Sequence, residues 1–423
     1  MINKILGMLL VCLISSAIPE VSFAVQVPQG FPHLAGMDIG GNVKAYSDPV
    51  YQRGASKFDM YFVQYYPMSP NLQLDIQTMR TALGGVKKLN PNILIGQYTI
   101  LNEAQDDIRL YVANRDIALK LNAENWWLRK SDGSRVQWTT NYSAWDINIS
   151  TWARPDSNGM RYPQWIAKRD YDHFFGPVPE IDIWYHDNVS SKSYVVSADW
   201  NLDKADELSS SPAIQTAFRN AQVSNWNASK GLAPARLQMG NADNDLSSPE
   251  YKAQLHGVFL EGLMGKSWSL ETLQGWPAMM ARYHAAFTNL LQPKLVVFNT
   301  WGAASNYSFF RYAYTSCLLD DGYFSYTDLS KGYSGVPPWF DEYGVKLGKA
   351  IDPPQVLPWL GNVFKRAFEN GMVVVNSGLK PATVSVPAGY KYFLGTQDPV
   401  INNGSPAIAI SLPGKSGVVL VKR

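Results

Sequence analysis

Two carboxylates, Asp187 and Glu261, each end a strongly apolar stretch of the sequence. Asp187 closes the run that begins at Ile181, and Glu261 closes the run that begins at Gly257. A carboxyl group at the end of an apolar strand is only partly solvated, so one acid can stay protonated while its partner is ionised. Cleavage of a glycosidic bond requires such a pair. We therefore predict Asp187 as nucleophile or transition-state stabiliser and Glu261 as general acid/base.

The sequence leaves the separation of the two acids open. If they end the fourth and sixth parallel strands of a barrel, one strand lies between them and their backbones are ~9–10 Å apart. Inward-leaning side chains would bring the carboxyls to ~5 Å, the retaining geometry, whereas ~9 Å would fit an inverting enzyme. In the alternative interpretation, each acid pairs with a neighbouring Lys or Arg and only closes the barrel.

Eight apolar runs that end in polar residues supply the strands needed to position these acids. They are HLAGMDIG, FDMYFVQYY, NILIGQYT, IDIWYHDN, ARLQMGNA, HGVFLEGL, KLVVFNTW and CLLDDGYFSYTD. Stretches long enough for helices separate them, and eight such units over ~300 residues favour a barrel over a doubly wound sheet. No glycine-rich nucleotide motif follows the first run. We predict an α/β protein with a (β/α)8 TIM barrel over residues 25–350.

Barrel enzymes carry their functional groups where the strands end, at one face of the barrel. The other polar or aromatic residues predicted there are candidate ligands for a carbohydrate substrate: Asp38, Gln64, Gln97, Asn188, Asn241, Asn299, Trp301 and Asp321. Asp38 could equally cap the following helix. Asp321, between Asp320 and Gly322, could equally belong to a turn.

Other barrel chemistries lack the residues that they need. The histidines stand singly rather than in acid–base pairs, and no predicted strand ends in a lysine for a Schiff base. His186 should point away from Asp187 and pack beneath a helix, because neighbouring strand residues face opposite ways. Asp243 and Asp245 are spaced like weak calcium ligands, but a polar loop explains them more simply. We expect no metal and no cofactor.

The stretch between the third and fourth runs is long and rich in tryptophan. Asp132-Gly133 predicts a hairpin turn within it, and YPQWIAKRDYDHFFG predicts a helix that leads into the fourth strand. We interpret the stretch as an elaborated loop at the carboxyl face of the barrel. Its candidate groove walls are Trp126, Trp127, Trp138 and Trp145.

Residues 1–24 have the pattern of a cleaved signal peptide, with a lysine, an apolar run and the small residues Ser22 and Ala24. This predicts a secreted or periplasmic protein that keeps only Cys317 and so has no internal disulfide. The net charge of +2, without a basic cluster, argues against nucleic acid as a partner. No later run approaches the ~20 apolar residues of a membrane span. We expect a monomer.

The composition changes near Ile351, where DPPQVLPW forms a proline-rich boundary. Beyond it, alternating β-rich runs are broken by Gly, Pro and Asn, which predicts a small antiparallel β-sandwich over residues 351–423. Its strands show no obvious aromatic platform, so we interpret it as a brace for the barrel rather than a glycan-binding domain.

Several segments taken in order resemble those of the hypothetical glycosyl hydrolase-like family fifteen and, more distantly, polygalactosaminidase-type barrels. They are WIAKRDYDHFFG, IDIWYHDNV, HGVFLEGL, RYAYTSCLLDDGYFSYTD, FKRAFENGMVVVNSG and SGVVLVKR. The resemblance implies a barrel followed by a β-sandwich, with catalytic acids at Asp187 and Glu261. Trp-Tyr-His before Asp187 departs from the plain aliphatic residues usual in such relatives.

Three functions are compatible with these features. The first is hydrolysis of O-glycosidic bonds in a polysaccharide or oligosaccharide outside the cytoplasm. The second is carbohydrate binding without catalysis on the same barrel, and the third is a role in the assembly of an envelope polysaccharide. The sugar, its linkage and the choice between internal and terminal cleavage stay open at this point.

Overall fold

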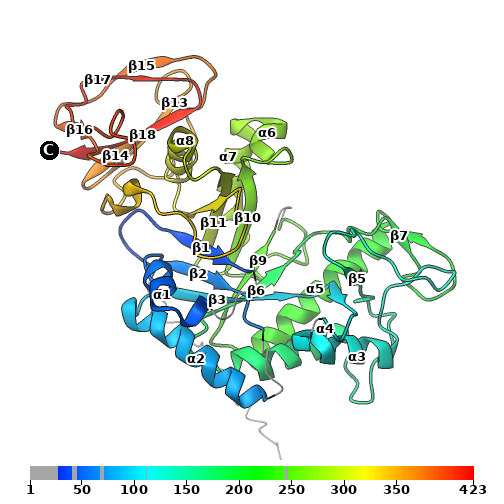
Figure 1. The fold of residues 1–423 in the computed structure, drawn as a ribbon. Helices are drawn as coiled ribbons and strands as arrows, with labels where there is room; N and C mark the ends of the chain where they lie inside the picture. Colours follow the sequence, from blue (N-terminus) through cyan, green and yellow to red (C-terminus); the bar gives the residue numbers. More distant parts are fainter. Residues whose placement is uncertain (1–26, 41–44, 67–70, 111, 243–245) are drawn as a thin grey trace, which may run out of the picture.

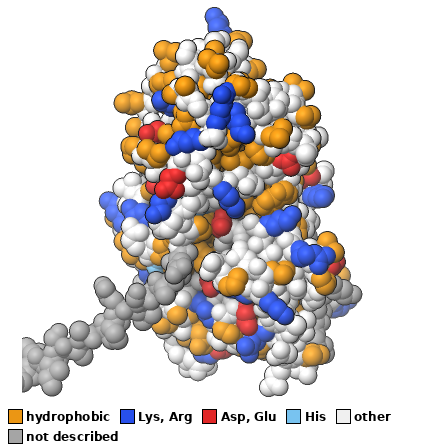
Figure 2. Space-filling view, turned by 90° about the vertical axis from the view of Figure 1, so that its left-hand side faces the viewer, with side chains coloured by type: hydrophobic (Ala, Val, Ile, Leu, Met, Phe, Trp, Pro, Cys, Tyr) orange, Lys and Arg blue, Asp and Glu red, His pale blue; other side chains and the backbone are white. Residues whose placement is uncertain are grey.

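The computed structural model describes residues 27–40, 45–66, 71–110, 112–242 and 246–423. The predicted signal peptide, Asp243 and Asp245 lie outside these ranges. Within them, no helix combines the length and the apolar character that a bilayer crossing needs. On the face shown in Figure 2, basic and acidic side chains are scattered among uncharged ones, and hydrophobic side chains gather at the top, over the C-terminal sheets.

Eight parallel strands form one sheet whose order follows the chain (Figure 1). They are β1 (Ala35–Asp38), β2 (Met60–Val63), β3 (Leu94–Ile100), β6 (Ile183–Asp187), β9 (Leu237–Asn241), β10 (Gly257–Met264), β11 (Leu295–Gly302) and β12 (Tyr323–Asp328). The sheet closes where Leu34 bridges Phe324, whose N–H donates to the His33 carbonyl at 2.9 Å. The predicted (β/α)8 barrel is confirmed.

Helices pack on the outside of the strands. The helices are α1 (Pro49–Ala55), α2 (Leu72–Leu89), α3 (Arg115–Glu124), α4 (Tyr162–Asp170), α5 (Pro212–Leu232), α6 (Leu270–Gln274), α7 (Trp276–Ala286) and α8 (Tyr307–Cys317), with short turns η1 (Ala45–Ser47), η2 (Val112–Asn114), η3 (Tyr171–Phe175) and η4 (Asp341–Gly344). In α2, the Asn71 side chain caps the first turn by accepting from the Leu74 N–H. Met79, Leu83 and Val86 follow at helical spacing and are buried against the sheet.

The inside of the barrel is filled by alternate residues of the strands. Met60, Phe62, Ile183, Tyr185, Leu237, Met239, Phe259, Leu295, Val297 and Tyr323 belong to this inner cluster. Asp187 is two residues beyond Tyr185, and Glu261 is two residues beyond Phe259. Both carboxylates therefore continue the inward-facing rows and lie above an apolar floor at the carboxyl end of the barrel.

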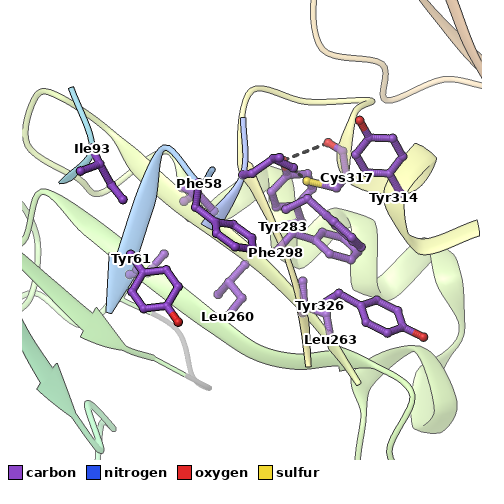
Figure 3. Packing of buried hydrophobic residues seen from close by; sticks show 14 of the residues in the cluster. Phe58, Tyr61, Ile93, Leu260, Leu263, Tyr283, Phe298, Tyr314, Cys317 and Tyr326 are labelled. Atoms are coloured by element: carbon purple, nitrogen blue, oxygen red, sulfur yellow. Dashed lines mark hydrogen bonds between the residues drawn. The ribbon is translucent and has the colours of Figure 1, made fainter. Parts of the chain in front are cut away.

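A second apolar layer lies between the strands and the helices. Figure 3 shows part of it, where Tyr283 of α7 meets Phe298 of β11 with ring centroids 5.0 Å apart. The Tyr283 hydroxyl donates to the carbonyl of Cys317 at 3.0 Å. Burial raises the pKa of the Cys317 thiol, which therefore stays protonated and serves as a small apolar core group.

The long excursion after β3 builds its own small core beside the barrel mouth. In it β4 (Glu103–Gln105) pairs with β5 (Ala144–Asp146). The segment after β6 adds the pair β7 (Ser197–Ala198) and β8 (Glu207–Leu208) and contributes Val195, Ala198 and Trp200 to the same core; both pairs are antiparallel. Gly133 takes φ 85° at the predicted turn. Trp126 and Trp127 are buried in this core, so the expectation that they wall a groove is wrong. Trp138 and Trp145 remain half-buried.

Two small antiparallel sheets follow the barrel. β13 (Val363–Phe368), β14 (Gly371–Asn376), β18 (Ser416–Lys422) and β16 (Tyr390–Tyr392) form one, and β15 (Ala382–Ser385) and β17 (Ala409–Leu412) form the other. The larger sheet packs on α8 through β14 and β18 (Figure 1). Trp276 of α7 contacts Phe364 at a ring distance of 4.6 Å, and Lys415 pairs with Glu271 of α6 at 2.6 Å. The boundary near residue 351 stays a prediction.

Arg366 of β13 ties the larger sheet to the barrel. Only 1% of Arg366 is exposed, and its guanidinium donates to the carbonyls of Leu318 and Asp352 and to the carboxylate of Asp321. We expect Arg366→Ala to lower the free energy of unfolding by ~2–4 kcal/mol, because it leaves a cavity and unpaired buried carbonyls. Urea denaturation checks this, with half-buried Lys365→Ala as the control. Equal losses for both variants would contradict it.

Candidate active site

One amide holds the two carboxylates together. The Asn241 side-chain nitrogen donates to Oδ1 of Asp187 at 2.9 Å and to Oε2 of Glu261 at 2.8 Å. Because β9 lies between β6 and β10, Asn241 ends the strand between the two acids. Both bonds share one nitrogen, so these two oxygens lie within about 5.7 Å, the sum of the two bond lengths. The inward-leaning arrangement is the one that the structure contains.

Two tyrosines bind the outer oxygens of the pair. Tyr98 of β3 donates its hydroxyl to Oδ2 of Asp187, and Tyr333, from the loop after β12, donates to Oε1 of Glu261 at 3.0 Å. Burial, followed by the negative charge of the acid that each one faces, raises the pKa of both hydroxyls, so they remain donors. Both acids are half-buried and reachable from solvent. Each carboxylate is thus held by donors on both of its oxygens.

A third acid, Glu103 of β4, lies beside the pair. Glu103 accepts a hydrogen bond from the indole N–H of Trp138. Burial is the main cause that raises the Glu103 pKa, the Trp138 bond lowers it, and the charge of Asp187 raises it further. The excursion therefore brings Glu103 and Trp138 to the mouth of the barrel.

Asp146 gives the excursion a measurable pH dependence. It lies opposite Glu103 in the β4–β5 pair and accepts from the Trp138 backbone N–H at 2.9 Å. Burial chiefly, and Glu103 less, raises the Asp146 pKa from 3.8 to about 7. Since the folded protein holds this proton more tightly than the unfolded chain, its contribution to stability is complete below pH 3.8 and is lost as pH rises towards 7.

We expect Asp146→Asn to flatten the stability profile between pH 4 and pH 7, because the amide keeps an acceptor for Trp138 but does not titrate. The difference in unfolding free energy from the wild type should change by up to ~1.4 kcal/mol per pH unit in this window. Urea denaturation at a series of pH values measures it, with the exposed carboxylate Asp172→Asn as the control. Parallel profiles for wild type and Asp146→Asn would contradict the expectation.

Two amides predicted as substrate ligands are used inside the protein. Gln97 is fully buried and exchanges hydrogen bonds with the Tyr65 backbone. Asn299 is also fully buried, donates to Ser325 and Thr327 and accepts from the Gly262 N–H. Asn299 further accepts from Tyr333 at 3.3 Å. The expectation that these two amides contact a sugar is wrong, although Asn299 positions the tyrosine that binds Glu261.

Two predicted acids also lie away from the pair. Asp38 ends β1 but is fully buried, and its carboxylate accepts a hydrogen bond from the Tyr51 hydroxyl of α1 at 2.8 Å. The residue that caps the N-terminus of α1 is Asp48 and not Asp38. Asp321 precedes β12, so it lies at the opposite end of the barrel, where it pairs with Arg366. Both expectations of a sugar contact are wrong, because Asp38 faces the helices and Asp321 precedes a strand instead of ending one.

The remaining predicted residues border the site. Gln64 is half-buried and donates to Tyr66, and Asn188 follows Asp187 with φ 54°. Trp301 is 9% exposed and packs on Tyr333 at 4.8 Å, with the Lys266 ammonium 4.0 Å over its ring.

His186 faces the helical layer as predicted. It bonds Gln238 at 2.8 Å and packs against Trp226 of α5. Burial lowers its pKa to about 4, so it is neutral at physiological pH. This position and charge state fit a packing role.

Among the described residues, one group has the spacing of metal ligands. Oxygens of Asp199, Asp203 and Glu207 lie within 4.8 Å of one another. The backbone N–H groups of Asp203 and Lys204 donate to Asp199, and that of Trp200 donates to Glu207. The group belongs to the β7–β8 hairpin, well away from β10 in Figure 1.

The fold defines a glycosidase-type (β/α)8 barrel. Residues 87–372 match the hypothetical glycosyl hydrolase family 15, and the chain belongs to this family. No curated protein matches the sequence. The solved structure of Amy13B from Eubacterium rectale is similar, with 10% identity, a TM-score of 0.52, and coverage of 94% of this chain and 96% of that one.

Two further solved structures align more loosely. The glycoside hydrolase domain of PelA from Pseudomonas aeruginosa has 11% identity and a TM-score of 0.43, covering 70% of this chain and 95% of that one. A debranching enzyme from Nostoc punctiforme has 14% identity and a TM-score of 0.46, covering 89% and 88%. At such identities a structural likeness concerns the fold alone.

Proposed function

We propose that this protein hydrolyses O-glycosidic bonds of a polysaccharide or oligosaccharide with net retention of anomeric configuration. The observation that carries the proposal is the amide of Asn241 shared by Asp187 and Glu261. Retaining glycosidases hold their carboxyls ~5–5.5 Å apart, whereas inverting ones need ~6.5–9.5 Å for a water. The limit of about 5.7 Å between the two bonded oxygens fits the first class.

Asp187 is the nucleophile in this mechanism. Its carboxylate attacks the anomeric carbon while Glu261 gives its proton to the departing glycosidic oxygen. Glu261 then takes a proton from water, the hydroxide oxygen replaces Asp187 on the anomeric carbon, and both acids return to their starting states. Tyr98 and Asn241 donate to Asp187 and hold it as an anion aimed at the mouth.

Asn241 has a second capacity in this scheme. Within the described part of the chain, its side-chain oxygen is buried and has no hydrogen-bond partner. An unpaired buried acceptor is costly unless a ligand pairs it. A hydroxyl of the bound sugar next to the cleaved bond would supply that donor.

The proposal is tested by incubating the purified protein with a panel of soluble polysaccharides and following reducing ends. For a cleaved substrate, proton NMR of the first products gives the anomer. Retention is expected, and an inverted first product would contradict the mechanism. Glycan binding without any release of reducing ends would favour the carbohydrate-binding alternative instead.

We also propose that the protein acts outside the cytoplasm, on the support of the signal-peptide pattern in residues 1–24. Mass spectrometry of the protein recovered from the periplasm or the medium tests this. A mature chain that starts after Ala24 is the expected result, and an uncleaved cytoplasmic chain would contradict it.

A further inference from the structure

Exposed aromatic side chains are rare in this protein and concentrate near the carboxylates. Over the described ranges, three aromatic residues are exposed: Tyr142 by 57%, Trp268 by 52% and Trp152 by 38%. The other aromatic residues are buried or half-buried. A flat apolar ring left in water is a natural platform for the C–H face of a sugar. Tyr142 and Trp268 both belong to segments that border the acid pair.

Tyr142 belongs to a row of three rings, of which Tyr142 and Trp138 lie on the excursion and Tyr194 lies in the segment after β6. Trp138 lies 5.9 Å from Tyr142 and 5.2 Å from Tyr194 between ring centroids. Trp138 is fixed at both its indole and its backbone N–H, by Glu103 and Asp146 respectively. Ile100 at the end of β3 pairs with Asp187 in the sheet, and Glu103, which accepts from the Trp138 indole, follows three residues later. Partial burial and then the charges of Glu261, Glu103 and Asp187 raise the Tyr142 pKa. The row therefore lies beside the Asp187 side of the acid pair.

Trp268 borders the pair from the β10 side. Its ring lies directly against Gly262, the residue after Glu261, where an added Cβ would come within 2.3 Å of the indole. Gly262 also has φ 57°, a second reason why this position needs glycine. The Lys266 N–H donates to Ser269 at 2.9 Å, which fixes the turn that carries Trp268. The exposed indole is thus held in place beside the acid/base residue.

Around the barrel, the order of strands sets the excursion and Trp268 on opposite sides of the pair. The excursion follows β3, then come Asp187 on β6, Asn241 on β9 and Glu261 on β10, and Trp268 follows β10. Here rings are present on both sides.

We infer that the substrate is a glycan chain that continues on both sides of the cleaved bond, with one arm on Trp138 and Tyr142 and the other on Trp268. Cleavage then falls within chains rather than at their ends. This inference rests on the proposed hydrolysis, but the two can fail separately.

The test uses the single variants Tyr142→Ala and Trp268→Ala, with Trp152→Ala as the matched exposed aromatic. Binding is measured in a Glu261→Gln background by affinity electrophoresis in gels containing dextran, xylan, chitosan or polygalacturonate. Both rim variants should bind the retained polysaccharide ~3–10-fold more weakly, as expected for lost ring contacts, and Trp152→Ala should bind like its parent. Equal binding by all three variants, or no retention by any gel, would overturn the inference.

Product length gives the second measurement. With Glu261 restored, viscosity should fall early relative to reducing-end release. The rim variants should lose activity on the polymer, whereas Trp152→Ala should keep it. Release of only mono- or disaccharides from the start would overturn the inference and leave hydrolysis standing. Ring-dependent binding without any turnover would instead refute hydrolysis and keep the extended glycan site.

Discussion

Glu261→Gln should lower kcat by ~10²–10⁴-fold on substrates with poor leaving groups, because the amide cannot give a proton to the glycosidic oxygen. The fold should persist, since glutamine can still accept from Asn241 and Tyr333, the two donors to this side chain. Reducing-end assays on the substrate found in the panel measure the loss, with thermal unfolding as a check of folding. Half-buried Glu124→Gln of α3, which pairs with Lys120 away from the acid pair, is the control.

Azide separates the roles of the two acids. In Glu261→Ala, azide should restore turnover of an activated aryl glycoside and give a glycosyl azide of retained configuration, because the glycosyl–Asp187 ester still forms. In Asp187→Gly, azide should attack directly and give the inverted product. The reverse pattern would exchange the roles of the two residues. Wild-type activity in either variant would remove that acid from the mechanism.

Asn241→Ala should lower kcat/KM by ~10²–10³-fold, the usual cost of losing one donor to a charged reacting group. Two carboxylates ~5 Å apart repel by ~3 kcal/mol at an effective dielectric constant of ~20, and the shared amide offsets this repulsion. Without it, ionising both acids becomes harder. In the active state Asp187 is ionised and Glu261 is protonated, so activity ends at high pH when Glu261 ionises as well. The basic limb of the kcat/KM profile should therefore move to higher pH.

The pH profile distinguishes positioning from simple loss of structure. The control Asn188→Gly removes the neighbouring amide at a position where φ is 54° and glycine is unstrained. Its profile should match the wild type. An Asn241→Ala profile that falls in height without moving along the pH axis would refute the electrostatic role assigned to Asn241.

The eight apolar runs sufficed to predict the barrel because each strand is buried on both faces and so leaves a short, unbroken hydrophobic signature. They also located Asp187 and Asn241, which end β6 and β9, and Glu261, which lies within β10; all three are in phase with the inward-facing residues. The same alternation separates Tyr98 from Gln97: Leu94 and Gly96 place Tyr98 in the inward row and Gln97 in the outward one. The alternation of inward and outward residues in β3 therefore predicts Tyr98, which donates to Asp187, as the residue that faces the site.

No short sequence pattern identifies the other residues of the site. Glu103 and Tyr142 reach the mouth because β4 pairs with β5 across about forty residues, and such long-range pairing is set by packing rather than by nearby residues. Tyr333 comes from an irregular loop after β12. Asp321 was misplaced because its apolar run contains both the end of α8 and the strand that follows it. Burial of Trp126 and Trp127 follows from the same excursion core.

The contacts of the C-terminal sheets with α6 and α7 bear on how such proteins could be recombined. Lys415 binds Glu271 and Phe364 packs on Trp276, and these two partners lie just after the turn that carries Trp268. A hybrid that takes its terminal sheets from a relative would inherit a mismatched support beneath the turn that carries Trp268. Residues 271 and 276 should therefore be exchanged together with the sheets.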